Sequence, residues 1–241
     1  MSKIALVTGA NKGIGLETAR QLAKAGVQVI LAARDAEKGR SAAACLKAEG
    51  LNAQSVVLDV TDGASIAAAM EELTARHRHL DILVNNAGVS LENGSTKTSQ
   101  VSLDTWRKTF DTNFFGVIAV TQAFLPLLEK SPAGRIVNLS SILGSITLHS
   151  DPKSPIYNFK VAAYNVSKSA LNAYTVQLAY ELRNTSIKVN AVHPGHVKTD
   201  MGGEAAPMEI MEGAKSSVAM ALIGADGPNG TFSHLGNALP W

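Results

Sequence analysis

Tyr164 and Lys168 are the residues of this sequence best suited to proton transfer. They are four positions apart, and in a helix this spacing places both side chains on one face, a turn apart. A tyrosine phenol, with a pKa of about 10 in water, exchanges a proton near neutral pH only when a nearby cation stabilises its anion. The Lys168 ammonium is such a cation. The pair indicates acid–base chemistry at an oxygen atom, as in carbonyl reduction, although an exposed helix face can also show this spacing by chance.

A second candidate site is the segment Thr8–Gly15, which reads Thr-Gly-Ala-Asn-Lys-Gly-Ile-Gly between a strand-like run and a helix-like run. Glycines there permit a tight turn and let backbone N–H groups approach a pyrophosphate, and the start of the following helix adds unpaired donors and a positive dipole end. The spacing is Gly-x-x-x-Gly-x-Gly. Its place directly after the first strand favours dinucleotide binding over an ordinary turn.

The end of the second strand distinguishes between the two nicotinamide cofactors. An NAD enzyme usually carries an acid there to bind the ribose 2′-hydroxyl, whereas here the corner reads Ala32-Ala33-Arg34-Asp35. The Arg34 guanidinium matches the 2′-phosphate of NADP, and Lys12 and Lys38 are placed to add charge to the same pocket. We therefore expect NADP(H), with Asp35 as the residue that could instead reach the ribose.

Short apolar runs alternate with longer segments of helical periodicity along the chain. Most of the runs are apolar throughout, as in strands buried on both faces, and strand–helix alternation predicts a parallel sheet. We predict a single-domain Rossmann-type doubly wound α/β fold over residues 1–241, with about seven strands and helices on both faces. The predicted strands are Ile4–Thr8, Val27–Ala32, Ser55–Leu58, Ile82–Asn85, Arg135–Leu139, Ile187–Val192 and a weaker Thr231–Phe232; helices are clearest at Gly15–Ala25 and Leu171–Leu182, and Leu143–Val161 and Gly202–Met211 are irregular.

The composition excludes several other classes of protein. The 241 residues carry a net charge of +2 without a dense basic block, which argues against nucleic acid as a partner. Cys45 is the single cysteine, and His77 and His79 are too poorly spaced on a helix for a metal pair, so we expect no disulfide and no metal. We find no signal-peptide pattern and no apolar stretch of about 20 residues, so we expect a cytoplasmic protein without a membrane segment.

Several motifs together resemble those of the short-chain dehydrogenase/reductase family, and the resemblance covers nearly the whole chain. Within the family the chain is most similar to carbonyl reductases, through Lys12, the Arg34/Lys38 pair, Asn113–Gly116 and a tail ending in Trp241. The matching motifs, in family order, are Thr8–Gly15, Asn85-Asn86-Ala87-Gly88, Asn113, Ser140-Ser141, Tyr164–Lys168 and Pro194-Gly195.

The resemblance implies a role for each matching residue. Tyr164 would be the general acid in reduction and the base in oxidation, and Lys168 would lower its pKa and hold the nicotinamide ribose. Ser141, rather than Ser140, would hydrogen-bond the substrate oxygen, and Asn113 would anchor a water that links Lys168 to solvent. The cofactor would contact Gly9, Asn11, Lys12, Gly13, Ile14, Gly15, Arg34, Lys38, Asp59 and Val60 (adenine), Asn86 (ribose), Gly88, and Pro194, Val197 and Thr199 (nicotinamide).

The chain departs from many family members by an insertion between Ser141 and Tyr164. The insertion would lie near the helices through which tetrameric relatives assemble, so we expect a monomer, with a dimer as the alternative. The expected partner is a small carbonyl or alcohol substrate. Two other functions stay open: a regulator that binds NADP(H) without turnover, and a reductase of carrier-bound ketoacyl chains. A carrier-bound substrate should require a basic docking patch, whereas the irregular loops carry only Lys153 and Lys160. A hydrolase would need a Gly-x-Ser-x-Gly elbow, which is missing.

Overall fold

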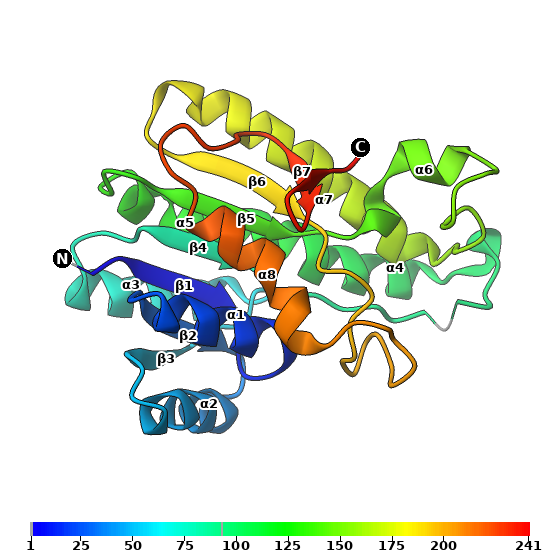
Figure 1. The fold of residues 1–241 in the computed structure, drawn as a ribbon. Helices are drawn as coiled ribbons and strands as arrows, with labels where there is room; N and C mark the ends of the chain where they lie inside the picture. The colour runs from blue at the N-terminus through cyan, green and yellow to red at the C-terminus, as the bar shows by residue number, and fades with distance from the viewer. Residues whose placement is uncertain (1, 93) are drawn as a thin grey trace.

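The computed structural model describes residues 2–92 and 94–241. Over this part of the chain the strands form one eight-stranded sheet of order β3-β2-β1-β4-β5-β6-β7-β8 (Figure 1). Strands β1 to β7 are parallel, and β8 alone is antiparallel. Their bounds are β1 Ile4–Thr8, β2 Gln28–Ala33, β3 Ala53–Val57, β4 Ile82–Asn85, β5 Arg135–Leu139, β6 Lys188–Val192, β7 Phe232–His234 and β8 Asn237–Ala238.

The parallel doubly wound sheet predicted from the sequence is confirmed, with one strand more than the expected seven. The extra strand, β8, has two residues and pairs with β7 after a tight turn at Leu235 and Gly236, whose φ angles are +47° and +84°. A strand of two residues is too short to show alternation or an apolar run, so no sequence pattern predicts it. The other differences are shifts of one or two residues at strand ends.

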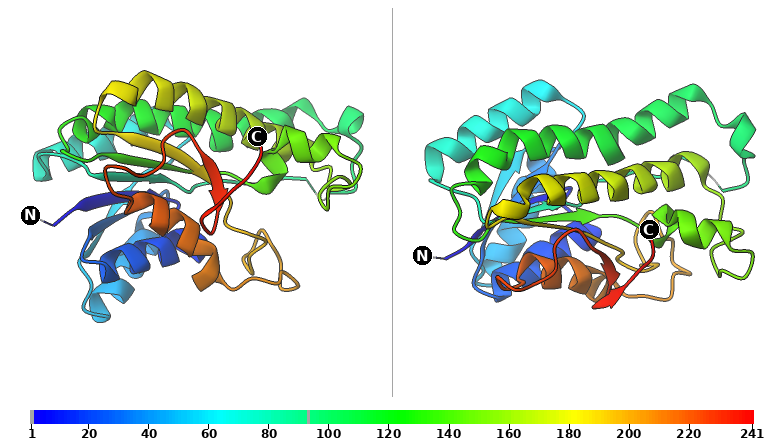
Figure 2. Two further views of the ribbon diagram at one scale, coloured as in Figure 1. Left: turned by 45° about the horizontal axis from the view of Figure 1, so that its top comes forward. Right: turned by 90° about the horizontal axis from the view of Figure 1, so that it is seen from above.

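Helices cover both faces of the sheet (Figure 2). Side chains alternate along β1, so that Ile4 and Leu6 pack on one face and Ala5 and Val7 on the other. The first face carries α3 Gly63–Arg76, α5 Gly116–Leu128 and α7 Ala162–Glu181, and the second carries α1 Gly13–Lys24, α2 Ala36–Ala48 and α8 Ile210–Ala221. These two buried layers hold the strand ends, and therefore the site, in a fixed arrangement.

The predicted irregular segment before Tyr164 contains a short helix, α6 Ile146–Ser150, after a 3-10 turn at Ile142–Gly144. Ser145 caps α6, accepting a hydrogen bond from the Leu148 N–H at 3.2 Å. The carbonyl oxygen of Trp241 accepts hydrogen bonds from the Thr147 N–H at 2.9 Å and from Ser145 Oγ at 3.2 Å, which ties the start of α6 to Trp241. Long-range contacts of this kind cannot be read from local periodicity.

One helical stretch, Leu103–Leu128, is long and apolar enough to cross a membrane by length and composition. It comprises α4 Leu103–Phe110, a π-helical turn at Asp111–Phe115 and α5. Val120, Phe124 and Leu128 on this stretch are fully buried against the sheet. Apolar residues that pack in this way are typical of a core helix.

Candidate active site

The carboxyl ends of β1, β4, β5 and β6 border a cleft of about 880 Å³. The strand order reverses between β1 and β4, and at such a point the loops on either side diverge and leave room for a ligand. Most of the predicted site residues line this cleft: Gly9, Asn11, Lys12, Gly13, Ile14, Gly15, Arg34, Asp59, Val60, Asn86, Gly88, Tyr164, Lys168, Pro194 and Thr199.

The glycine turn between β1 and α1 leaves a helix N-terminus open to the cleft. Gly9 and Gly13 have φ angles of +62° and +57°, which residues with a side chain rarely adopt. At Gly15, a methyl group would lie 2.6 Å from the Gly9 carbonyl oxygen and would also clash with the Asn86 amide. Lys12, the N-cap residue of α1, forms no capping hydrogen bond, because its ammonium group has no acceptor to offer the helix N–H groups. The first N–H groups of α1 are therefore placed for an anion such as a pyrophosphate.

Asn86 holds this turn in shape. Its amide donates to the carbonyl oxygens of Thr8 at 2.7 Å and Gly9 at 3.2 Å, and the backbone N–H groups of Asn86 and Ala87 each donate to Thr8 Oγ1 at 3.0 Å. Asn86 also lines the cleft. The structure adds that its amide tightens the glycine turn from the neighbouring strand.

Of the two cations expected at the end of β2, Arg34 lines the cleft and Lys38 does not. Arg34 is exposed and lines the cleft, close enough to Asp59 that its charge helps to lower the pKa of that carboxyl, after the larger effect of the Thr61 backbone N–H. Lys38 pairs with Asp35 at 3.6 Å and is not among the described residues that line the cleft. Arg34 is thus the cation at this corner.

Asp35 caps the helix that follows it, α2, with one oxygen of its carboxylate. Its Oδ1 accepts hydrogen bonds from the backbone N–H groups of Glu37 at 3.0 Å and Lys38 at 3.1 Å, which caps α2. These bonds, led by that from Lys38, lower the pKa of the Asp35 carboxyl. As an N-cap, Asp35 is turned toward its own helix.

Lys12 lines the cleft at the other side of the turn and forms an ion pair with Asp200, in the loop after β6. Thr199 of the same loop lies over the turn, because a methyl group on Gly13 would be 3.7 Å from its Cγ2. Sequence reasoning missed Asp200, which is 188 positions from Lys12 and belongs to no motif. The loop after β6 therefore closes over the glycine turn.

Tyr164 and Lys168 lie one turn apart on α7 and both face the cleft. The Lys168 Nζ is 5.7 Å from the centre of the Tyr164 ring and donates to the Leu139 carbonyl oxygen at 2.8 Å. Burial lowers the pKa of Lys168 to about 8. Burial raises the pKa of the Tyr164 phenol, and a hydrogen bond with the Ser141 side chain opposes that effect.

The two serines after β5 have different partners. Ser140 Oγ donates to Asn172 Oδ1 at 2.6 Å, which ties the end of β5 to α7 even though Ser140 borders the cleft. Ser141 is outside the cleft lining of the described chain, but its side chain hydrogen-bonds Tyr164 and accepts the Leu143 N–H at 3.2 Å. Of the two, Ser141 is the hydroxyl that meets Tyr164.

Asn113 lies in the π-helical turn between α4 and α5 and is fully buried, outside the lining of the cleft in the described chain. Its amide group donates to the Val89 carbonyl oxygen at 2.9 Å and to Ser167 Oγ at 3.0 Å, and its Oδ1 accepts the Val89 N–H at 2.8 Å. Both amide hydrogens are used, so a water at this residue could only donate a hydrogen bond, either to the second lone pair of Oδ1 or to the main-chain carbonyl oxygen.

Pro194 and Thr199, beyond β6, line the cleft, but Val197 does not. The Val197 side chain is 4% exposed and packs against α8, where a methyl group on Gly213 would lie 2.6 Å from it. The expectation that Val197 flanks the nicotinamide therefore finds no support in its side chain. His193 packs against His234 with ring centres 4.9 Å apart, and burial lowers its pKa to about 3, so it is a neutral packing residue.

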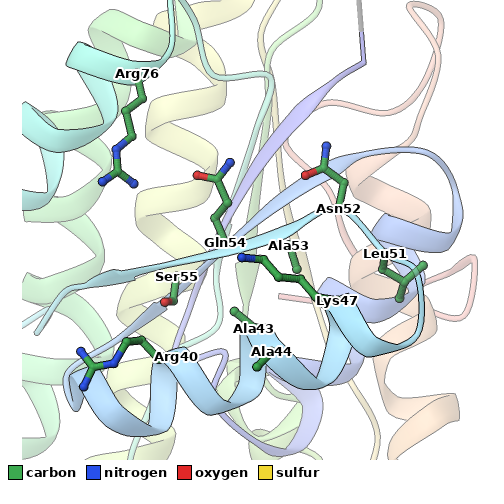
Figure 3. A pocket seen from close by; sticks show the side chains of 10 residues that line it. All are labelled: Arg40, Ala43, Ala44, Lys47, Leu51, Asn52, Ala53, Gln54, Ser55 and Arg76. Atoms are coloured by element: carbon green, nitrogen blue, oxygen red, sulfur yellow. The ribbon is translucent and has the colours of Figure 1, made fainter.

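A second hollow of about 640 Å³ lies at the edge strand β3 and is lined by residues of α2, of β3 and of the loop between them, together with Arg76 (Figure 3). Arg40, Lys47 and Arg76 give it a basic rim, but none of the predicted catalytic residues lies there. Within residues 2–92 and 94–241, no three His, Cys, Asp or Glu side chains gather where they could hold a metal ion.

Comparisons with known proteins show the family to which the chain belongs. Residues 3–210 match the family model described as short chain dehydrogenase. Carbonyl reductase [NADPH] 1 from Mus musculus is 34% identical, covering 99% of this chain and 98% of its own, and (+)-neomenthol dehydrogenase from Capsicum annuum is 32% identical, covering 96% and 95%. The NADPH-bound carbonyl reductase from chicken fatty liver superposes with a TM-score of 0.87 at 29% identity, covering 100% of this chain and 99% of that one. The chain is therefore a member of the short-chain dehydrogenase/reductase family, an oxidoreductase whose relatives include carbonyl reductases.

Proposed function

We propose that this protein reduces a small ketone, aldehyde or quinone to the alcohol with NADPH, or catalyses the reverse oxidation. The observation that carries the proposal is the meeting of Ser141, Tyr164 and Lys168 where β5 ends beside α7. A phenol, a hydroxyl and a buried ammonium at one end of a dinucleotide cleft are the groups that carbonyl reduction requires.

The residues present fit a nicotinamide dinucleotide. The glycine turn and the uncapped start of α1 offer N–H donors to a pyrophosphate, Asp59 and Val60 border the adenosine end, and Pro194 and Thr199 border the other end. When bound, the cofactor supplies the hydride. Tyr164 would donate the proton to the substrate oxygen, and Ser141 would hold that oxygen by a hydrogen bond.

Lys168 would stabilise the phenolate that Tyr164 becomes after proton donation. Its pKa of about 8 keeps it mostly protonated at neutral pH, and in a buried site its positive charge acts on Tyr164 with little screening. Burial alone raises the pKa of Tyr164, so this charge is needed to make the phenol an acid of useful strength.

Arg34 supports a preference for NADPH. It lies at the end of the cleft where Asp59 and Val60 would border the adenosine, while the Oδ1 of Asp35 is engaged as the cap of α2. A charge-assisted hydrogen bond to a phosphate contributes about 1.5–3 kcal/mol, or roughly 10- to 100-fold in preference. Arg34→Asp should reverse or abolish the preference, and Lys38→Ala, a change outside the cleft, should leave it within about threefold. Equal catalytic efficiency of the unmodified protein with NADPH and NADH would refute this assignment.

The reaction is tested by NADPH consumption with a panel of aldehydes, ketones and quinones. Tyr164→Phe keeps the ring and should bind NADPH normally while kcat falls by about 10²- to 10⁴-fold. Ser141→Ala should lower kcat without changing NADPH affinity, and the matched change Ser140→Ala should lower kcat less, because its hydroxyl is bonded to Asn172. NADPH binding without turnover on any substrate would favour a regulatory protein instead. Turnover confined to carrier-bound ketoacyl substrates would favour a biosynthetic reductase.

A further inference from the structure

Glu92 contacts the backbone of Tyr164 from a distant part of the chain. Its Oε2 accepts a hydrogen bond from the Tyr164 N–H at 3.1 Å, across 72 positions of sequence. Tyr164 is the third residue of α7, and the first N–H groups of a helix have no acceptor within the helix. Val161, at the N-cap, forms no capping hydrogen bond with its side chain. Glu92 thus supplies the acceptor, and its negative charge is placed at the favourable end of the helix dipole.

The carbonyl oxygen of Tyr164 is also linked to the chain before Glu92, through Ser167 and Asn113. Ser167 Oγ donates to the Tyr164 carbonyl oxygen at 2.7 Å and accepts from the Asn113 amide at 3.0 Å. Asn113 in turn bonds both backbone groups of Val89. The segment Gly88–Glu92, which follows β4, therefore reaches the Tyr164 backbone from two sides, directly through Glu92 and indirectly through Asn113.

Gly94, two positions further along, is also near the start of α7. A methyl group on Gly94 would lie 3.9 Å from Val161 Cγ2. The second oxygen of Glu92, Oε1, is buried and has no hydrogen-bond partner among the described residues. The hydrogen bond that Oε2 accepts from the Tyr164 N–H offsets part of the free-energy cost of burying the Glu92 carboxylate.

We propose that Glu92 is a positioning residue, which sets the place of the Tyr164 hydroxyl relative to Ser141 and the substrate oxygen. The inference rests on the proposed function, in which Tyr164 is the proton donor. A phenol reaches its target only if its Cα is placed correctly, and a displacement of about 1 Å can lower a rate by about 10²-fold. Glu92 acts on the first turn of α7, where a helix frays most easily, and this is the turn that carries Tyr164.

The test compares Glu92→Ala and Glu92→Gln with the unmodified protein. Glu92→Ala removes the acceptor and should lower kcat, per NADPH-binding site, by roughly tenfold to a hundredfold, with NADPH affinity unchanged. The amide oxygen in Glu92→Gln can still accept the Tyr164 N–H, so kcat should stay within about threefold of the unmodified protein. The deuterium isotope effect on kcat with 4-deuterated NADPH should be at least as large in Glu92→Ala, since the chemical step is the one slowed.

A matched control separates positioning from loss of stability. Asp62 Oδ1 caps α3 by accepting the Ala64 N–H at 2.9 Å, and it does not line the cleft. Asp62→Ala removes a carboxylate cap of the same kind and should lower Tm while leaving kcat per binding site unchanged. If Glu92→Ala does not fold, Glu92→Asp, which retracts the carboxylate by one methylene group, is expected to show the same loss of kcat.

Three results would overturn the inference. Glu92→Ala could keep more than half the normal kcat per binding site, or its loss of activity could be explained wholly by a loss of NADPH-binding sites. Glu92→Gln could also prove as impaired as Glu92→Ala. A lack of turnover in the unmodified protein is a different result. It would overturn the proposed function before any variant is compared.

Discussion

Replacing Lys168 with methionine should change how the stability of the cofactor-free protein depends on pH. The Lys168 side chain is almost fully buried, and burial lowers its pKa from 10.5 to about 8. Between these two pKa values the unfolded chain keeps a proton that the folded protein has released. Stability therefore rises with pH through this window, since the unfolded state binds more protons there.

The size of the effect follows from the two pKa values. A difference of about 2.5 units corresponds to a cost of about 3 kcal/mol for keeping the ammonium buried well below pH 8, and this cost disappears above pH 10.5. From pH 7 to pH 9 the folded protein should recover about 1.4 kcal/mol of it. Methionine occupies a similar volume without a charge, so Lys168→Met should lack this recovery.

Urea unfolding at pH 7 and pH 9 measures the difference. The free energy of unfolding of the unmodified protein, relative to Lys168→Met, should increase by about 1.4 kcal/mol between the two pH values. Lys130→Met, a change of an exposed lysine, serves as the control and should follow the unmodified protein. Identical changes with pH in the unmodified protein and in Lys168→Met would show that Lys168 does not titrate in this range, and the argument from burial would be wrong.

Three further predictions concern the glycine turn, the base of the sheet and the assembly. Gly15→Ala should weaken NADPH binding more than tenfold in a titration, because the added methyl group meets the Gly9 carbonyl oxygen at 2.6 Å, whereas Gly63→Ala, which meets nothing within 4 Å, should bind NADPH normally. Arg135→Met should lower the free energy of unfolding by about 3–5 kcal/mol in urea, since four carbonyl oxygens lose the guanidinium as their donor at a cost of about 1–3 kcal/mol for each one left unsatisfied, and a loss below 1 kcal/mol would contradict this. Light scattering at micromolar concentration should give a mass near 25.2 kDa, the mass of one chain, and a stable tetramer would refute the expected monomer.

The sequence by itself determined the parts of this protein that depend on local patterns. The apolar runs placed β1, β4 and β5 at their observed residues, because a strand buried on both faces needs apolar side chains throughout. The spacing of Tyr164 and Lys168 placed both on one face of α7, since that geometry belongs to any helix. The glycines of the turn after β1 were also recognisable in the sequence, because glycine alone readily tolerates the positive φ and the close approach found there.

The tertiary structure decided which partner each side chain meets. The sequence placed Lys12, Arg34 and Lys38 in one pocket, yet only Lys12 and Arg34 of these three line the cleft, Lys12 as the ion-pair partner of Asp200, while Lys38 pairs with Asp35 outside it. Ser140 and Ser141 are neighbours in sequence, but in an extended chain consecutive side chains point in opposite directions, so one meets Asn172 and the other Tyr164.

Glu92 carries no signal in the sequence at all, because its partner lies 72 positions away and contacts it through a backbone N–H that every residue but proline possesses. For Val197 the family resemblance implied a place beside the nicotinamide, but in the structure its side chain packs against α8 and does not line the cleft. Local patterns specify the elements and their faces. The contacts between residues far apart in the chain exist only once those elements have packed.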